Sequence, residues 1–174
     1  MKALNERHSS RSFSAKELSQ QVLSNLLWAS SGINRPKSGF RTAPSAVNRQ
    51  EIDVYVALKS GLYLYDAKKH SLEPVIEEDI RAQVGVQAFT QTAPVSLVFV
   101  ADYTKMGTAS LDDKKFYSAT DTGFISQNVY LFCASEGLST VVLGWIDRPT
   151  LVKKMQLKDY QKVILTQPVG YPAE

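Results

Sequence analysis

Several stretches of the chain alternate between apolar and more polar residues, and this alternation predicts β-strands. Ile52, Val54, Val56 and Leu58 recur at every second position, which is the period of a strand. Short apolar runs predict further strands over Gly61–Asp66, Leu72–Val75, Val95–Ala101, Leu138–Ile146 and Lys162–Gln167. The Val95–Ala101 run is apolar almost throughout, which favours a central strand buried on both faces.

Other stretches have apolar residues three and four positions apart, the spacing of helices. Ser14 and Glu17 have the spacing of a capping box, so a helix is expected to begin there and to end near Gly32, with Trp28 in the core. Acidic residues at 77–79 predict a helix that continues to Phe89. Further helices are expected over Phe116–Gly137 and Arg148–Leu157.

The Phe116–Gly137 pattern is apolar on more than one face, as is typical of a helix buried against a second subunit. Residues 33–43 contain Pro36 and Gly39 and are expected to form a loop. A meander of strands followed by alternating helices and strands predicts an α+β fold layered on one sheet. The length of 174 residues suits one domain, 1–174.

The composition excludes several classes of protein. Hydrophobic residues make up 44% of the chain and charged residues 21%, which disfavours disorder and membrane insertion. The net charge is only +3 and no run of five like charges occurs, so nucleic-acid binding gains little support. Cys133 is the only cysteine, so neither an intramolecular disulfide nor a cysteine metal cluster is expected. Because the first residues lack the apolar core of a secretory signal, we expect a cytoplasmic protein.

The N-terminal sequence Arg7-His8-Ser9-Ser10-Arg11-Ser12-Phe13 has the composition of an anion-binding segment. In a helical turn or compact loop, Arg7 and Arg11 would lie close enough for their guanidinium groups to converge on one phosphate. Ser9 and Ser10 would add hydroxyl donors between them. A solvated basic terminus is the alternative explanation.

A second candidate segment follows the predicted loop at Pro44-Ser45-Ala46-Val47-Asn48. Its proline suits the first turn of a helix, and its small side chains would let a flat ligand with polar edges approach the backbone. An ordinary helix N-terminus explains the same pattern. Gln83, Gln87 and Gln91 are spaced by four, so one of them could reach a ligand. The sequence contains no obvious catalytic triad, metal cluster or catalytic carboxylate pair.

Four motifs in order resemble the FMN-dependent nitroreductase family: Arg-His-Ser-Ser-Arg-Ser-Phe, Pro-Ser-Ala-Val-Asn-Arg-Gln, Leu-Gly-Trp and a closing Pro-Val-Gly-Tyr-Pro. The resemblance covers nearly the whole chain. The segments around Tyr63–Asp66, Gln87 and Asp121-Thr122-Gly123 resemble the branch that contains the azole-forming peptide dehydrogenases. The resemblance implies a homodimer in which helices flank a central, mostly antiparallel sheet.

The resemblance also implies a set of FMN-binding residues. The phosphate and ribityl chain would be bound by Arg7, His8, Ser9 and Arg11, and the isoalloxazine ring would contact Pro44, Ser45, Ala46 and Asn48 across the homodimer interface. Leu143, Gly144 and Trp145 would run beside the ring, with a backbone N–H near flavin N5, and Gln87 would contact the ribityl chain or ring edge. No catalytic side chain and no metal are expected, because the flavin itself exchanges hydride.

The activity implied is transfer of hydride from NADH or NADPH through FMN to a nitroaromatic, a quinone or another flat small molecule. Two alternatives remain open. One is a flavoprotein of the same fold that oxidises an azoline-type substrate, or binds flavin, without using NAD(P)H. The other is a non-enzymatic module that binds an anion or nucleic acid.

Two features depart from the family pattern. The sequence ends at Glu174, whereas family members commonly continue to basic residues that complete the phosphate site, so Arg35, Lys37 or Arg41 is expected to compensate. Trp145 stands where the family often has glycine, and its bulk would narrow or block the substrate face.

Overall fold

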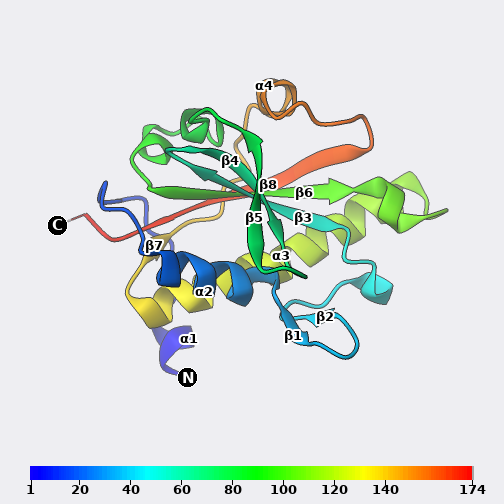
Figure 1. Cartoon of the computed structure of the whole chain (residues 1–174), viewed down its shortest axis with the longest axis horizontal. Helices are drawn as coiled ribbons and strands as arrows, with labels where there is room; N and C mark the ends of the chain where they lie inside the picture. Colours follow the sequence, from blue (N-terminus) through cyan, green and yellow to red (C-terminus); the bar gives the residue numbers. More distant parts are fainter. Residues whose placement is uncertain (174) are drawn as a thin grey trace.

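The computed structural model describes residues 1–173, and within this range six strands form one antiparallel sheet (Figure 1). The strands lie in the order β5-β4-β3-β6-β8-β7. Their bounds are β3 Ile52–Leu58, β4 Gly61–Asp66, β5 Ser71–Ile76, β6 Val95–Asp102, β7 Ser139–Thr140 and β8 Gln161–Gly170. The predicted α+β fold with an antiparallel sheet is confirmed.

The sheet is covered on both faces, and alternate residues of its central strands face opposite sides. In β3, Val54 and Val56 pack in one core while Tyr55 and Ala57 pack in the other. All of Val95–Ala101 in β6 is buried, as the continuous apolar run predicts.

Two helices, α2 (Gln20–Ser31) and α3 (Leu111–Glu136), cover one face of the sheet (Figure 1). The opposite face carries α4 (Arg148–Lys154) and short 3-10 turns. The remaining helix, α1 (Lys2–Glu6), packs beside α3. Ser110 caps the start of α3, and Gly137 ends it with a left-handed φ of 67°, so the predicted end of this helix is confirmed.

The predicted start of the first long helix is wrong. Ser19, not Ser14, is the N-cap of α2, and its hydroxyl accepts a hydrogen bond from the Val22 N–H at 3.3 Å. Residues 7–19 stay extended because the Ser14 N–H donates to the Tyr171 carbonyl at 2.9 Å and Phe13 is buried. Trp28 is also not a core residue, because it lies on the outer side of α2 and is 47% exposed.

The helix predicted over residues 77–89 is absent from the described chain, where only the 3-10 turns η2 (Arg81–Gln83) and η3 (Ala88–Gln91) form. The Asp79 carboxylate accepts from the Arg81 N–H at 3.0 Å and so favours a turn over a helix. A Cβ atom on Gly85 would lie within 2.9 Å of the side chains of Thr90 and Leu143. The segment therefore folds tightly against its neighbours.

Three other predictions need smaller corrections. The predicted loop at 33–43 contains a two-stranded ribbon, β1 (Ile33–Arg35) and β2 (Phe40–Arg41). The strand predicted over 138–146 shortens to β7 and an isolated bridge between Leu143 and Thr166. The expected helix at Pro44 is a single 3-10 turn, η1 (Ala46–Asn48), because Val47 and Asn48 have positive φ.

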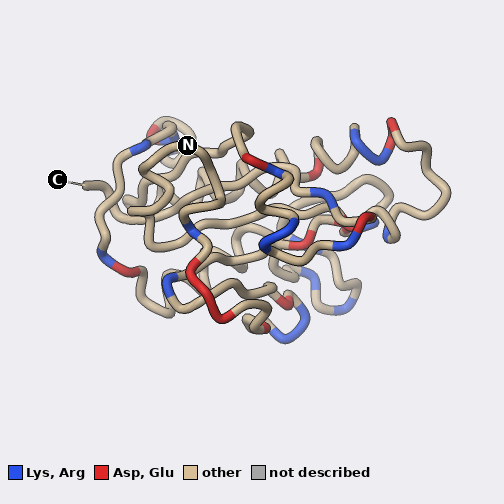
Figure 2. Tube along the Cα trace, turned by 90° about the horizontal axis from the view of Figure 1, so that it is seen from above, with Lys and Arg blue, Asp and Glu red and all other residues tan. Residues whose placement is uncertain are grey.

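Charged residues of both signs are interspersed over the trace rather than gathered on one side (Figure 2). Among the described helices, none combines the length and apolarity needed to cross a membrane. The same residues hold no group of three or more His, Cys, Asp or Glu side chains placed to share a metal ion.

Candidate functional site

The N-terminal segment that carries Arg7 and Arg11 is extended and lies against β7. The Ser10 N–H donates to the Thr140 carbonyl at 2.9 Å. Because Arg7–Arg11 is not helical, the expected convergence of the two arginines by helical spacing does not occur. His8 is exposed, and its Nδ1 lies 2.7 Å from the Glu6 carbonyl oxygen.

Tyr130 of α3 connects this segment to the chain that precedes Leu143. Its hydroxyl lies 2.9 Å from Ser9 Oγ and accepts a hydrogen bond from the Val142 N–H at 2.9 Å. The Arg7 guanidinium lies over the ring, 5.1 Å from its centroid, as in a cation–π contact. The sequence analysis did not single out Tyr130. A tyrosine in a helix that is buried on several faces could have pointed to it, because a buried tyrosine hydroxyl usually has a hydrogen-bond partner.

Leu143 and Gln87 meet the same region. Phe13, Val141 and Leu143 form a small buried core that Phe89 covers. A Cβ on Gly85 would lie 2.9 Å from Leu143 and 3.4 Å from Gln87 Oε1. Gln87 Oε1 is buried without a hydrogen-bond partner among the described residues, so an unsatisfied acceptor lies in this region. We call Arg7, Ser9, Tyr130, Gln87 and Leu143 the N-terminal cluster.

Gly144 and Trp145 continue from this cluster to the surface. The backbone groups of Leu143 pair with Thr166, and Arg148 donates to the Gly144 carbonyl at 3.2 Å. The N–H groups of Gly144 and Trp145 have no acceptor within residues 1–173, and the Trp145 side chain is 71% exposed. This strip therefore presents two free backbone donors beside an uncovered indole.

Pro44, Ser45, Ala46 and Asn48 lie in a second place, the 44–50 loop. The Ala46 N–H donates to Asp121 Oδ2 of α3 at 2.8 Å, and Ser45 Oγ accepts from the Gln50 N–H at 2.9 Å. Val47, Asn48 and Gln50 all have positive φ between 51° and 55°, a conformation that costs energy for residues other than glycine. The Val47 side chain is 86% exposed.

The compensating cations expected for a phosphate site are used elsewhere. Arg41 Nε donates to Gln50 Oε1 at 2.9 Å, and burial lowers the pKa of Arg41 from its ordinary value. Arg35 donates to the Arg41 carbonyl at 2.7 Å. Arg41 thus braces the 44–50 loop, and Arg35 braces the β1–β2 ribbon.

One chain does not bring all the predicted site residues together. The N-terminal cluster is attached to α3 at Tyr130, and the 44–50 loop is attached at Asp121. Nine residues of helix place the two attachment points about 13 Å apart along the axis and on opposite sides of it. Each chain therefore carries two separate groups of candidate site residues, attached to opposite sides of α3, which we call half-sites.

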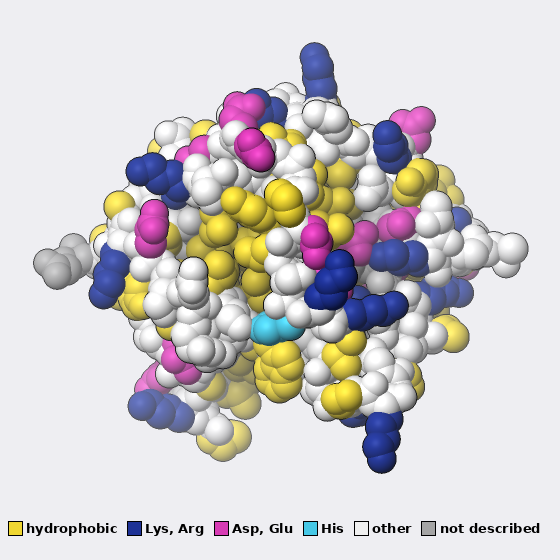
Figure 3. Space-filling model, viewed as in Figure 1, with side chains coloured by type: hydrophobic (Ala, Val, Ile, Leu, Met, Phe, Trp, Pro, Cys, Tyr) yellow, Lys and Arg dark blue, Asp and Glu magenta, His cyan; other side chains and the backbone are white. Residues whose placement is uncertain are grey.

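Two further features of the described residues lie outside the half-sites. Burial raises the pKa of the Cys133 thiol, so this cysteine is unreactive, as expected of a core residue. The face viewed in Figure 3 has a hollow of about 470 Å³ with apolar side chains, lined in part by Leu18, Leu23 and Leu58. None of its lining residues belongs to either half-site.

Comparison with known proteins gives matches over the whole chain. Residues 4–171 match the model of the Nitroreductase family. A relative from Methanocaldococcus jannaschii, provisionally named a nitroreductase, is 30% identical over 97% of this chain and 89% of its own length. The crystal structure of a protein from Ralstonia eutropha, also provisionally named a nitroreductase, has a TM-score of 0.96 and 42% identity and covers 100% of this chain and 83% of that one.

Two more distant structures share the fold. The Escherichia coli microcin synthetase McbBCD complex, with truncated pro-MccB17 bound, matches with a TM-score of 0.83 and 19% identity over 100% of this chain and 74% of that one. The NADPH:FMN oxidoreductase of Vibrio harveyi, complexed with NAD+, matches with a TM-score of 0.73 and 21% identity over 99% of this chain and 68% of that one. The family match and the overall likeness support an oxidoreductase of the flavin type, and the chain belongs to the nitroreductase family.

Proposed function

We propose that this protein is a homodimeric FMN-dependent oxidoreductase that passes hydride from NADH or NADPH to nitroaromatics, quinones or other flat acceptors. The observation that carries the proposal is the presence of two half-sites on opposite sides of α3. In a two-fold dimer built along α3, the N-terminal cluster of one subunit faces the 44–50 loop of its partner. The proposed dimer thus completes two equivalent sites.

The surface of α3 supports this arrangement. Phe116 and Phe124 are exposed although they are large and apolar, and a Cβ on Gly123 would meet nothing within 4 Å. Exposed apolar side chains mark a protein–protein contact, and a glycine with open space around it lets a second helix approach closely. The exposed Val47 at the tip of the 44–50 loop fits the same interface.

The donors of the N-terminal cluster fit the phosphate of FMN. Among residues 1–173, Arg7 and Arg11 form no ion pair with a carboxylate, so their charges are available to a dianion. The free Gln87 Oε1 suits a hydroxyl of the ribityl chain. The free N–H groups of Gly144 and Trp145 would donate to an acceptor on the edge of the isoalloxazine ring, such as N5.

Bound FMN would supply the redox chemistry, which the side chains themselves lack. The chain's own contribution is to hold the ring between the Leu143–Trp145 strip and the partner's 44–50 loop. The exposed indole of Trp145 would cover one side of the ring, exclude water and restrict the thickness of the acceptor. This is consistent with a site that needs no catalytic acid.

The test is an absorbance titration of the purified protein with FMN, followed by anaerobic addition of NADH and of NADPH. A flavin spectrum perturbed by binding and bleached by one of the nucleotides is expected, together with a dimer mass in light scattering. Bound flavin that neither nucleotide bleaches would favour the dehydrogenase that works on azoline-type substrates. A colourless protein that binds RNA or DNA with a steep dependence on salt would instead favour the anion-binding module.

A further inference from the structure

Two buried carboxyl groups meet beneath the 44–50 loop. Glu51 directly follows the loop, and its side chain is 0% exposed. Neither of its carboxyl oxygens has a hydrogen-bond partner in another residue that donates to it in the described chain. Its neighbours are its own backbone N–H and the carboxyl of Asp121. Asp121 is 2% exposed and accepts the Ala46 N–H through Oδ2.

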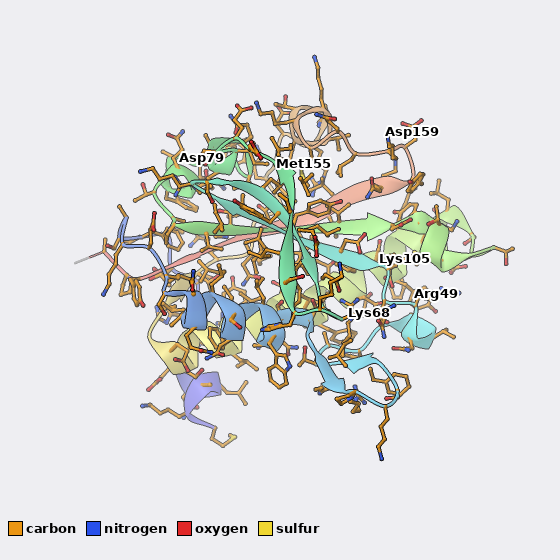
Figure 4. The ribbon with its side chains drawn as sticks, in the orientation of Figure 1. Arg49, Lys68, Asp79, Lys105, Met155 and Asp159 are labelled. Carbon is orange, nitrogen blue, oxygen red and sulfur yellow. The ribbon has the colours of Figure 1, made fainter. Side chains whose placement is uncertain are left out.

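Two adjacent carboxyl groups can form a hydrogen bond only when one of them is protonated. If both were ionised, two negative charges would be buried side by side and would repel each other strongly. Arg49 is the cation whose charge acts on Glu51, and it belongs to the same segment (Figure 4). A single proton shared by Glu51 and Asp121 would remove this repulsion and give the unpartnered Glu51 oxygens a hydrogen bond.

We propose that Glu51 is a positioning residue for the FMN site, and that the proton it shares with Asp121 holds the 44–50 loop against α3. The inference rests on the proposed function, because the loop is assigned to the flavin ring there. Glu51 itself would not contact the flavin. It acts through Asp121, which in turn fixes the Ala46 N–H.

The loop needs such a restraint because its conformation is costly. Three residues, Val47, Asn48 and Gln50, are held in the left-handed region. Asp121 supplies the hydrogen bond that joins the loop to α3. The hydrogen bonds of Ser45 and Arg41 join residues within the segment from β2 to β3. When the shared proton leaves, repulsion between the carboxylates separates the loop from α3, and the ring-binding surface is no longer in place.

The direction of the pH effect follows from the same pair. Burial, with a further contribution from Asp121, raises the pKa of Glu51 from 4.5 to about 7. A group whose pKa is raised by folding stabilises the fold fully below its unfolded pKa, and this contribution is lost as the pH rises through the folded value. Charged groups facing Glu51 from the packed elements are Asp121 on α3 and Arg49 on the loop. The restraint is thus present in mild acid and absent in mild alkali.

The experiment measures the FMN dissociation constant by quenching of flavin fluorescence at about pH 6 and about pH 8.5, in wild type and in Glu51→Gln. The glutamine amide can donate permanently to Asp121, so it imitates the protonated carboxyl. We expect a roughly tenfold weaker FMN affinity for wild type at the higher pH and a change of less than about twofold for Glu51→Gln. Asp121→Asn, which can donate to Glu51, is a second variant that should flatten the profile.

Asp53→Asn is the matched control, because Asp53 lies two residues further along the chain but pairs with Lys105 at 2.6 Å instead of with α3. It should keep the wild-type pH profile. Infrared difference spectra of the protein without FMN supply an independent readout, since a protonated buried carboxyl has its own C=O stretch. That band should be present at the lower pH in wild type, be lost at the higher pH, and be missing in Glu51→Gln.

Equal pH profiles for wild type and Glu51→Gln would overturn the positioning role even if FMN binds well. Absence of the infrared band at the lower pH would overturn the shared proton. Failure of wild type to bind FMN at either pH would overturn the proposed function and with it the positioning role, while the infrared band would still report whether the pair shares a proton.

Discussion

The two half-sites of this protein are attached to the same helix and are built in opposite ways. The N-terminal cluster presents Arg7 on an aromatic ring, and Arg11 follows in the same segment, exposed to solvent. Neither arginine pairs with a carboxylate in the described chain. The 44–50 loop presents backbone and small side chains, which are held by buried groups beneath them. The first half-site therefore presents unpaired guanidinium groups, and the second presents a backbone held in one conformation.

This difference assigns distinct tasks to the two regions. Free guanidinium groups attract and neutralise a dianion, so the N-terminal cluster should set the affinity for the phosphate of FMN. A strained loop that is held in advance loses little further entropy on binding, so the 44–50 loop should set how the ring is oriented. Variants that separate affinity for phosphate from affinity for the ring test this division.

The largest effect is expected from the double variant Arg7→Ala/Arg11→Ala. Each charge-assisted contact is worth about 1.5–3 kcal/mol, so the loss of two should weaken FMN binding by at least about a hundredfold. Riboflavin, which has the same ring without the phosphate, should bind the variant and the wild type alike. Fluorescence titrations with both ligands measure this. A parallel loss of riboflavin affinity would contradict the division of tasks.

The next largest effect is expected from Asp121→Ala. This change leaves the Ala46 N–H without its acceptor, and a buried unsatisfied donor costs about 1–3 kcal/mol. Urea unfolding at fixed protein concentration should show a loss of about 2 kcal/mol. Because the loop is released, riboflavin affinity should fall together with FMN affinity. If only FMN binding weakened, Asp121 would have to act on the phosphate side.

The features that the sequence could predict are those that depend on local patterns. Strand β6 is predicted by a run that is apolar except for Ser96, and α3 by its length and the terminal Gly137. Burial and backbone conformation leave local patterns of this kind in a sequence. Short motifs led to the family and to the residues of both half-sites. These predictions depend on residues that are close together in the sequence.

Predictions failed where contacts between residues far apart in the sequence determine the local structure. Ser14 has the spacing of a cap, but its backbone is held by Tyr171 from the other end of the chain. The segment predicted as a helix at 77–89 instead packs tightly around Gly85, where Thr90 and Leu143 leave no space for a Cβ. The roles of Tyr130 and Glu51 depend on partners far from them in sequence, and no local pattern records such a pairing.

A moderate effect is expected from Tyr130→Phe, which keeps the ring under Arg7 and removes the hydroxyl. The Val142 N–H loses its acceptor and Ser9 loses a partner, so stability should fall by about 1–2 kcal/mol. FMN and riboflavin affinities should fall by similar factors, since Val142 leads into the strip beside the ring. Thermal unfolding and the two titrations measure this. A variant as stable as wild type would show that the hydroxyl does not join the two segments.

The smallest effect concerns the strain in the 44–50 loop and is expected from Val47→Gly. Valine at φ 55° and ψ 24° is disfavoured by its branched Cβ, and glycine relieves this cost while making the unfolded chain more flexible. The two effects oppose each other, so stability should rise by less than about 1 kcal/mol. Val47→Ala is the matched control, because it removes the same exposed side chain and keeps a Cβ in the left-handed region. Urea unfolding should find Val47→Gly more stable than Val47→Ala. If Asp121 and Glu51 hold the loop in its conformation, and not the backbone preference of residue 47, the two variants should bind flavin equally well.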